Sequence, residues 1–162
     1  MTNLELLELY SALDLKELNN LAGVKFSYAV AKNLNSLLPD IKSIEATLKF
    51  SKLYDAYEKE RIELAKKHAK KEAGKPVKEI VIENGRKIER FVLENTEKFN
   101  KELEVLRTKH KKALDEREKQ ISQYEDLLKE EVKVKLYKVN LKDVPKDITP
   151  GQIKGIYAII EE

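Results

Sequence analysis

Residues 77–92 read VKEIVIENGRKIERFV, and this stretch decides how the rest of the chain is interpreted. Stretches that mix apolar and charged residues flank Asn84-Gly85, a dipeptide that tolerates the positive φ angles of a type I′ turn. The stretch therefore predicts a β-hairpin with a two-residue loop. Its cross-strand pairs would be Glu83 with Arg86, Val81 with Ile88, Glu79 with Arg90 and Val77 with Val92.

Long helical patterns flank this hairpin. Apolar residues recur at helical spacing over residues 24–71 and again over 95–131. Pro39 lacks a backbone N–H, so we expect it to kink or break the first helix. At 1.5 Å per residue the two arms, 40–72 and 95–131, would each be about 50 Å long. Their matched lengths predict an antiparallel coiled coil with the β-hairpin of residues 73–94 at its tip.

The two ends of the chain, residues 1–39 and 132–162, are predicted to form a small α+β base. Residues 132–136 read VKVKL, and this strict alternation predicts a half-buried strand. Residues 149–152 read TPGQ and supply an N-cap, a proline at the first helical position and a capping-box glutamine, which predicts a final amphipathic helix. The fold class is mainly α with a small β component, in a single elongated domain of 162 residues. No internal repeat is evident.

The strand over residues 132–136 has no obvious partner in its own chain, because the β-hairpin would lie at the far end of arms about 50 Å long. It would pair with another copy, pair with another protein, or lie along the base as an edge. We therefore expect the protein to form a homo-oligomer or to bind another protein. The interface candidates are Val132, Val134, Leu136, Ile153, Ile156 and Tyr157.

The sequence contains no convincing catalytic or metal-binding motif. There is no Cys, and the two histidines, His68 and His110, lie on or beside apolar stripes, as packing or interface histidines do. No glycine-rich phosphate loop or nucleophile elbow is present. Carboxylates alternate with lysines, so no general acid and base can be identified. We expect a non-enzymatic protein without a cofactor, a metal or a small-molecule substrate.

Charged residues make up 38% of the chain, but the net charge is only +3, so the charge is mixed. One basic cluster near the predicted tip could bind nucleic acid by releasing counterions from phosphates. Nearby glutamates dilute its field, and lysines also protect exposed hairpin edges, so a solvated edge is the alternative. The cluster comprises Lys66, Lys67, Lys70, Lys71, Lys75, Lys78, Arg86, Lys87 and Arg90.

No window approaches the run of about 18 apolar residues that a membrane span requires, and the N-terminus does not resemble a signal peptide. With no Cys, the composition fits a reducing compartment, and the expected location is cytoplasmic. The richness in Lys and Glu is typical of proteins from hot environments and also of coiled coils.

Residues 25–34 read KFSYAVAKNL and precede a long charged helix. In this segment, and in the final stretch from residue 130 to the closing helix at 149–162, the chain resembles a family of small uncharacterised proteins of tailed bacteriophages and prophages. The resemblance implies a viral or prophage origin, in host cytoplasm or virion, and brings no catalytic residues. Two helices bridged by a β-hairpin also resemble a prefoldin-type chaperone subunit, although the elements at both termini depart from that pattern.

These observations favour a structural or assembly protein that self-associates through its base. Two alternatives stay open. One is a nucleic-acid-binding accessory protein that uses the lysine-rich tip, and the other is a prefoldin-like holdase chaperone.

Overall fold

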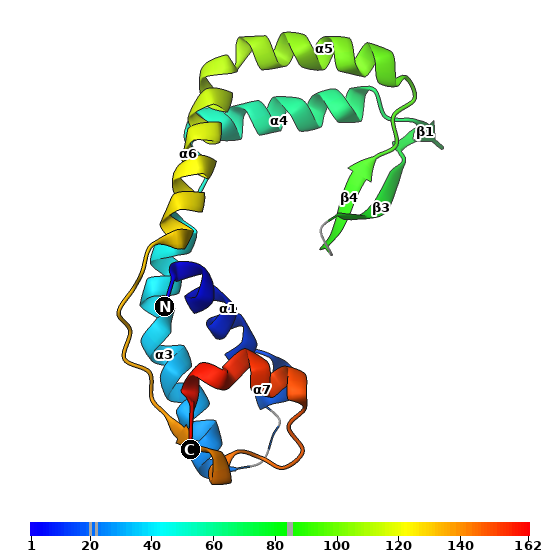
Figure 1. The fold of residues 1–162 in the computed structure, drawn as a ribbon. Coiled ribbons are helices and arrows are strands. Elements are labelled where there is room, and N and C mark those ends of the chain that lie inside the picture. Colours follow the sequence, from blue (N-terminus) through cyan, green and yellow to red (C-terminus); the bar gives the residue numbers. More distant parts are fainter. Residues whose placement is uncertain (20, 22, 84–85) are drawn as a thin grey trace. The chain divides into compact units, whose positions relative to one another are not determined.

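The computed structural model describes residues 1–19, 21, 23–83 and 86–162 (Figure 1). The protein is mostly helical, at 64%, with small antiparallel β-hairpins. The chain divides into two compact units. The first, called the terminal unit here, comprises Met1–Lys49 and Gln120–Glu162, and the second, the central unit, comprises Phe50–Lys119. Both boundaries fall inside the predicted arms.

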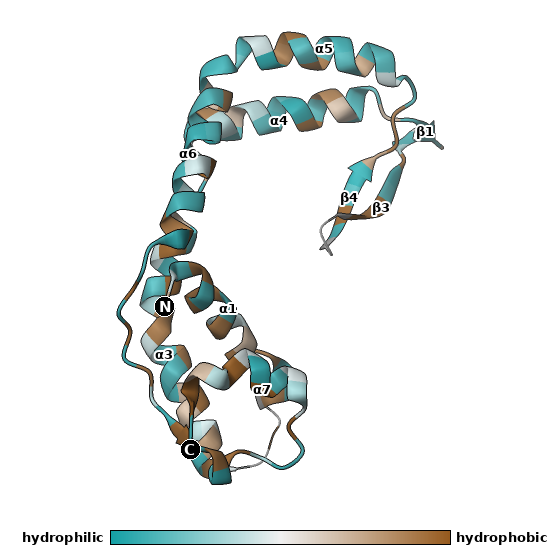
Figure 2. Ribbon diagram, viewed as in Figure 1, coloured by the Kyte–Doolittle hydropathy of each residue, from teal (hydrophilic) through white to brown (hydrophobic). Residues whose placement is uncertain are grey.

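Helices dominate the terminal unit: α1 (Asn3–Leu13), α2 (Lys16–Asn19), α3 (Val24–Ala46), the last part of α6 (Lys111–Lys129) and α7 (Pro150–Ile156). The predicted capping box at the start of α7 forms, and a second capping box starts α1. Figure 2 shows apolar and polar residues alternating along α1, α3 and α7, as amphipathic helices require. Their apolar sides form one core, which contains Leu6, Leu9, Leu13, Leu18, Phe26, Ala29, Val30, Leu37, Ile41, Ile44, Val139, Ile156 and Ile159.

The first long helix does not break at Pro39. Helix α3 continues through this residue to Ala46, because its apolar stripe stays buried on both sides, at Leu37 and Ile41. The interruption comes later in the chain, at residues 47–51, which separate α3 from α4 (Lys52–Lys67). The side chain of Gln120 donates to the exposed carbonyl groups of Thr47 and Lys49 there.

The prediction of a strand over residues 132–136 is wrong, but the predicted alternation of buried and exposed side chains is correct. Val132, Val134 and Leu136 pack against the core, while Lys133 and Lys135 are exposed. The backbone of this segment joins no ladder in the described structure. At its start the N–H of Val132 donates to the carbonyl group of Met1 at 2.8 Å, next to an isolated bridge between Thr2 and Glu131. The ladder of this region is shorter and comes later: β5 (Val139–Asn140) pairs in parallel with β6 (Ile160–Glu161).

A buried asparagine holds this extended segment in place. Asn33 on α3 is 0% exposed, and its side-chain oxygen accepts from the backbone N–H of Tyr137 at 2.9 Å. Its side-chain nitrogen donates to the carbonyl groups of Tyr137 and Ala29, both at 2.8 Å. The Asn33 amide therefore makes the hydrogen bonds to the Tyr137 backbone that a neighbouring strand would otherwise make. Both polar atoms of the amide are hydrogen-bonded, as a buried polar group in an apolar core requires.

The central unit contains α4, four short strands, α5 (Thr96–Lys109) and the first part of α6. The strands are β1 (Lys71–Glu72), β2 (Lys75–Pro76), β3 (Lys78–Glu83) and β4 (Arg86–Phe91). The predicted register of β3 and β4 is confirmed, with Glu83 opposite Arg86, Val81 opposite Ile88 and Glu79 opposite Arg90. The predicted turn at Asn84-Gly85 lies outside the described residues.

A second hairpin, β1–β2, was not predicted. It turns at Ala73 and Gly74, both with positive φ angles of 49° and 77°. Residues 73–94 were predicted as a single hairpin, because alanine rarely adopts a positive φ and Ala73 therefore gives no signal for a turn.

The two arms are each divided into two helices. Residues 47–51 separate α3 from α4, and His110 separates α5 from α6. Within the central unit α4 and α5 pack as an antiparallel pair, since Glu60 contacts Lys109 while Lys67 contacts Glu102. The longer coiled coil over residues 40–131 stays a prediction.

Candidate interaction surface

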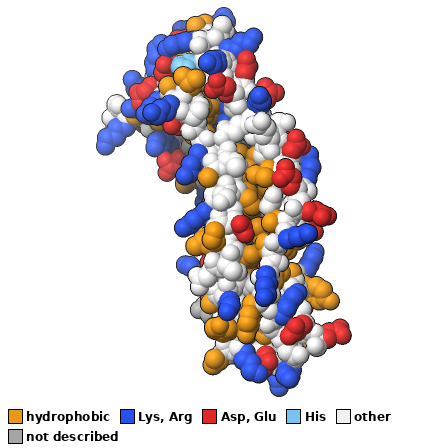
Figure 3. All heavy atoms as spheres, turned by 90° about the vertical axis from the view of Figure 1, so that its left-hand side faces the viewer, with side chains coloured by type: hydrophobic (Ala, Val, Ile, Leu, Met, Phe, Trp, Pro, Cys, Tyr) orange, Lys and Arg blue, Asp and Glu red, His pale blue; other side chains and the backbone are white. Residues whose placement is uncertain are grey.

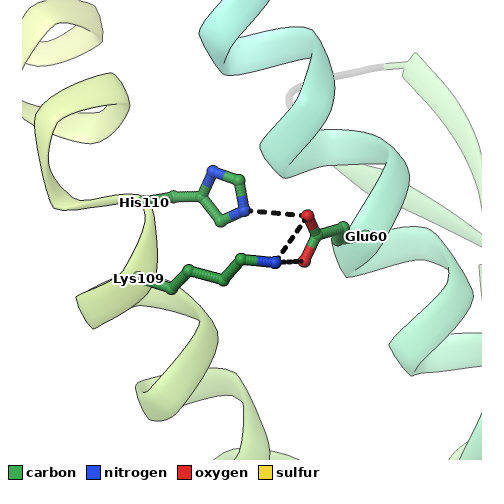
Figure 4. A network of polar contacts seen from close by, with 3 residues as sticks. All are labelled: Glu60, Lys109 and His110. Carbon is green, nitrogen blue, oxygen red and sulfur yellow. Dashed lines mark hydrogen bonds and ion pairs between the residues drawn. The ribbon is translucent and has the colours of Figure 1, made fainter.

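Two similar polar clusters fasten α4 to α5. In the first, the Glu60 carboxylate accepts from Lys109 Nζ at 2.6 and 2.9 Å, and Glu60 Oε1 lies 3.1 Å from His110 Nε2 (Figure 4). In the second, Glu102 lies 2.7 Å from Lys67 Nζ and 3.1 Å from His68 Nε2. Each histidine is the C-cap of its own helix and reaches across to the other one.

The two clusters are built from a repeated sequence pattern. Residues 57–68 and 99–110 both contain an aromatic residue, then Glu, Leu, Lys and His at the same spacing. The first set is Tyr57, Glu60, Leu64, Lys67 and His68, and the second is Phe99, Glu102, Leu106, Lys109 and His110. Because the helices are antiparallel, each set supplies half of both clusters. The pair therefore has an approximate two-fold axis.

The aromatic residues obey the same symmetry. The ring of Tyr57 lies edge-on to His110, with centroids 5.7 Å apart, and Phe99 lies edge-on to His68 at 6.1 Å. Both histidine side chains are mostly buried, with 14% and 12% of their surface exposed. Their predicted role as packing or interface residues agrees with this geometry, and they lie in separate clusters.

This repeat was not predicted from the sequence. Its members are separated by the two hairpins, and charged residues at helical spacing resemble any solvated helix. Aligning the sequence with itself would have revealed the shared Glu-x-x-x-Leu-x-x-Lys-His pattern.

The electrostatics of the clusters favour ionised carboxylates. The hydrogen bond from Lys109 is the main cause that holds the pKa of Glu60 below its ordinary value, and His110 adds to this effect. The hydrogen bond from Lys67 is likewise the main cause that lowers the pKa of Glu102, and the nearby His68 adds to this effect. The clusters differ in one detail: His110 hydrogen-bonds to Glu60, whereas His68 Nε2 is within ion-pair distance of Glu102 but is not aligned for a hydrogen bond within the described residues.

Between the two clusters lies a shallow groove of about 460 Å³. Leu64 and Leu106 form its apolar centre, and Val105 stands at its edge with 71% of its surface exposed. Val105 occupies the position in α5 that Glu63 occupies in α4, which is the one departure from the repeat in this groove.

A second groove, of about 640 Å³, lies between the helix pair and the β3–β4 hairpin. It is lined by Ile62, Ala65, Val81, Ile88, Phe91, Leu93 and Phe99, with Arg61, Lys78, Glu89 and Arg90 among its charged residues. On β3 itself, Ile80 and Ile82 are 66% and 73% exposed. The central unit therefore presents apolar surface on more than one side.

The predicted basic cluster lies around the hairpins of the central unit, and five of its members are paired with carboxylates. The pairs are Lys66 with Glu63, Lys67 with Glu102, Lys70 with Glu72, Lys78 with Glu89 and Arg90 with Glu79. The side chain of Arg86 is outside the described part of the chain. Figure 3 shows acidic and basic side chains interspersed over the face that it presents, with apolar side chains between them.

The six predicted interface residues all belong to the terminal unit. Val132, Val134 and Leu136 pack against its core, and Ile156 is fully buried in that core. Ile153 is half-buried, and Tyr157 is 71% exposed. Most of this set is therefore used within the chain, and Tyr157 is the member with the largest free surface.

Among the described residues there is no group of three or more His, Asp or Glu side chains that could hold a metal ion. In the part of the chain that the structure describes, no helix is both long and apolar enough to cross a membrane. Comparisons of the chain with known protein families, curated proteins and solved structures found no match.

Proposed function

We propose that this protein is a non-enzymatic assembly protein that associates with other protein chains, including copies of itself, through its central unit. The observation that supports this proposal is the amount of apolar surface left exposed there. The exposed side chains are Phe50, Leu53, Ile62, Ile80, Ile82, Ile88 and Val105. The buried ones among the described residues are Tyr57, Ala69, Leu106 and Ala113.

So small a core leaves a unit of this size marginally stable by itself. Covering its exposed apolar surface with another chain would stabilise it, and clustered apolar surface on a protein commonly marks such a contact. The base was the expected interface, and it also exposes large apolar side chains, among them Val24 and Tyr157, but it is built on the core of the terminal unit, whereas the described residues of the central unit bury few apolar side chains. The central unit is therefore the better candidate.

The predicted long coiled coil over residues 40–131 is part of the same proposal. Only His110 separates α5 from α6, so a partner that straightened this break would join them into one arm. The resemblance of residues 25–34 to uncharacterised bacteriophage proteins is our reason for including a viral or prophage origin in the proposal.

Light scattering coupled to size exclusion tests the proposal. We expect the full chain to have the mass of a defined oligomer, at low and high salt alike, with no gain in mass when DNA or RNA is added. A monomer at every concentration would contradict self-association. A monomer that gains mass with nucleic acid only at low salt would favour the lysine-rich cluster as the functional surface.

A holdase activity is the second candidate, and the exposed Ile80 and Ile82 on β3 favour it. Both side chains point to the same side of a two-stranded hairpin, where they could contact unfolded clients. If this is correct, the protein suppresses aggregation of an unrelated client and Ile80→Ser/Ile82→Ser does not. Equal suppression by both proteins, or none by either, would remove this candidate.

A further inference from the structure

The groove between the two clusters carries a regular pattern of charge. Glu60 and Lys67 are two helical turns apart on the same side of α4, and Lys109 and Glu102 face them from α5. Negative and positive groups therefore alternate around four corners. Leu64, Leu106 and Val105 lie between these corners, and Glu63, which is 71% exposed and paired with Lys66, lines the groove on α4 at the position equivalent to Val105. We call the four corner residues together with Leu64, Leu106 and Val105 the paired face.

An alternating square of charge is complementary to itself. Consider a second copy laid face to face on the first, related by a two-fold axis that runs along the helices. Its Glu60 then lies over Lys109 and its Lys67 over Glu102. A two-fold axis across the helices instead places Glu60 over Lys67 and Lys109 over Glu102. Either arrangement brings opposite charges together at all four corners.

We infer that the paired face binds the paired face of a second copy of this chain, forming a four-helix bundle from two α4–α5 pairs. This inference rests on the proposed function and names its contact surface. Neighbouring helices in the bundle are antiparallel, which also opposes their helix dipoles. Such isologous contact is the commonest way in which identical chains associate.

Val105 makes this inference easy to test. Its side chain is 71% exposed in the single chain, so it contributes little to the fold, yet it would be buried in the bundle. We expect Val105→Lys to fold normally and to weaken self-association by at least about tenfold, measured by analytical ultracentrifugation over a range of concentrations. The matched control is Val24→Lys, since Val24 is 88% exposed and belongs to the terminal unit.

Charge exchange provides the second test. The variant Lys67→Glu/Lys109→Glu has an entirely acidic paired face, and Glu60→Lys/Glu102→Lys has an entirely basic one. Each variant alone should be monomeric because it repels itself. Mixing the two should restore the mass of the dimer, with helical content checked by circular dichroism.

The outcomes separate this inference from the proposed function. An unmodified protein that is oligomeric, together with a Val105→Lys variant of unchanged mass, would overturn the paired face and leave self-association standing. The same conclusion follows if the mixed charge variants are folded but stay monomeric. An unmodified protein that is monomeric at all concentrations would overturn both.

Discussion

The two units of this chain are held together in different ways. The terminal unit buries its apolar side chains in one core shared by α1, α3 and α7, and its one buried polar side chain among the described residues, Asn33, is fully hydrogen-bonded. In the central unit, α4 and α5 are joined largely by exposed ion pairs, while many apolar side chains face outward. Exposed ion pairs contribute little free energy but fix register and orientation. The comparison supports the proposal that the central unit, rather than the terminal unit, contacts another chain.

The largest effect is expected from Asn33, the polar residue of the terminal core. Asn33→Leu leaves the N–H and carbonyl groups of Tyr137 without their buried partner and should lower the free energy of unfolding by about 3 kcal/mol, measured by urea denaturation. The matched control is Asn35→Leu, because Asn35 is exposed on the same helix and should change stability by no more than about 0.5 kcal/mol. Equal losses in the two variants would contradict the role given to Asn33.

The next largest effect concerns the contact between α1 and α7. A Cβ atom at Gly155 would lie 2.9 Å from the Cβ of Ala12, so Gly155→Ala should force the helices apart and cost about 2 kcal/mol in thermal or urea unfolding. Gly151 is on the same helix with open space around it. Gly151→Ala should therefore stabilise the protein by about 0.5 kcal/mol. A neutral Gly155→Ala would show that α1 and α7 do not pack so closely.

The smallest effect concerns pH and the central unit. The pKa values of Glu60 and Glu102 are lowered from 4.5 by their lysine and histidine partners. Their ion pairs therefore stabilise the α4–α5 pair at pH values above 4.5, and this contribution is lost as the pH falls through the lowered pKa values. Hydrogen exchange of α4 and α5, expressed as protection factors that correct for the pH dependence of intrinsic exchange, should therefore show a loss of protection in that acidic range.

Glu60→Gln/Glu102→Gln should make this exchange less dependent on pH, whereas Glu8→Gln, at an exposed position of α1, should not. The measurement is best made at a concentration low enough to keep the protein monomeric. An unchanged pH dependence in the double variant would show that the two clusters do not stabilise the helix pair.

The hairpin and the helix caps could be predicted from the sequence because their determinants are local. The pairing of Glu79 with Arg90 follows from a two-residue loop, and the N-caps at Thr2, Asn95 and Thr149 follow from side chains within three residues. Alternation over residues 132–136 showed correctly which side chains are buried. It carried no information on what the backbone contacts, which is why a segment lying on helices was assigned as a strand.

The candidate site depended on contacts between distant residues and was not predicted. His68 and His110 were recognised as packing or interface residues, but each acquires its glutamate only when α4 and α5 pair. The prediction of a break at Pro39 failed for the opposite reason. It used the local preference of proline, which was overridden by the burial of Leu37 and Ile41 in the core.

Hydrogen exchange of the full chain, followed by mass spectrometry at increasing protein concentration, tests most directly whether the central unit is the contact surface. We predict that the amides of α4 and α5 become more protected as the concentration rises, while those of α1 and the first half of α3 do not change. Protection that rises in α1 and α7 instead, or that is independent of concentration throughout, would contradict this account.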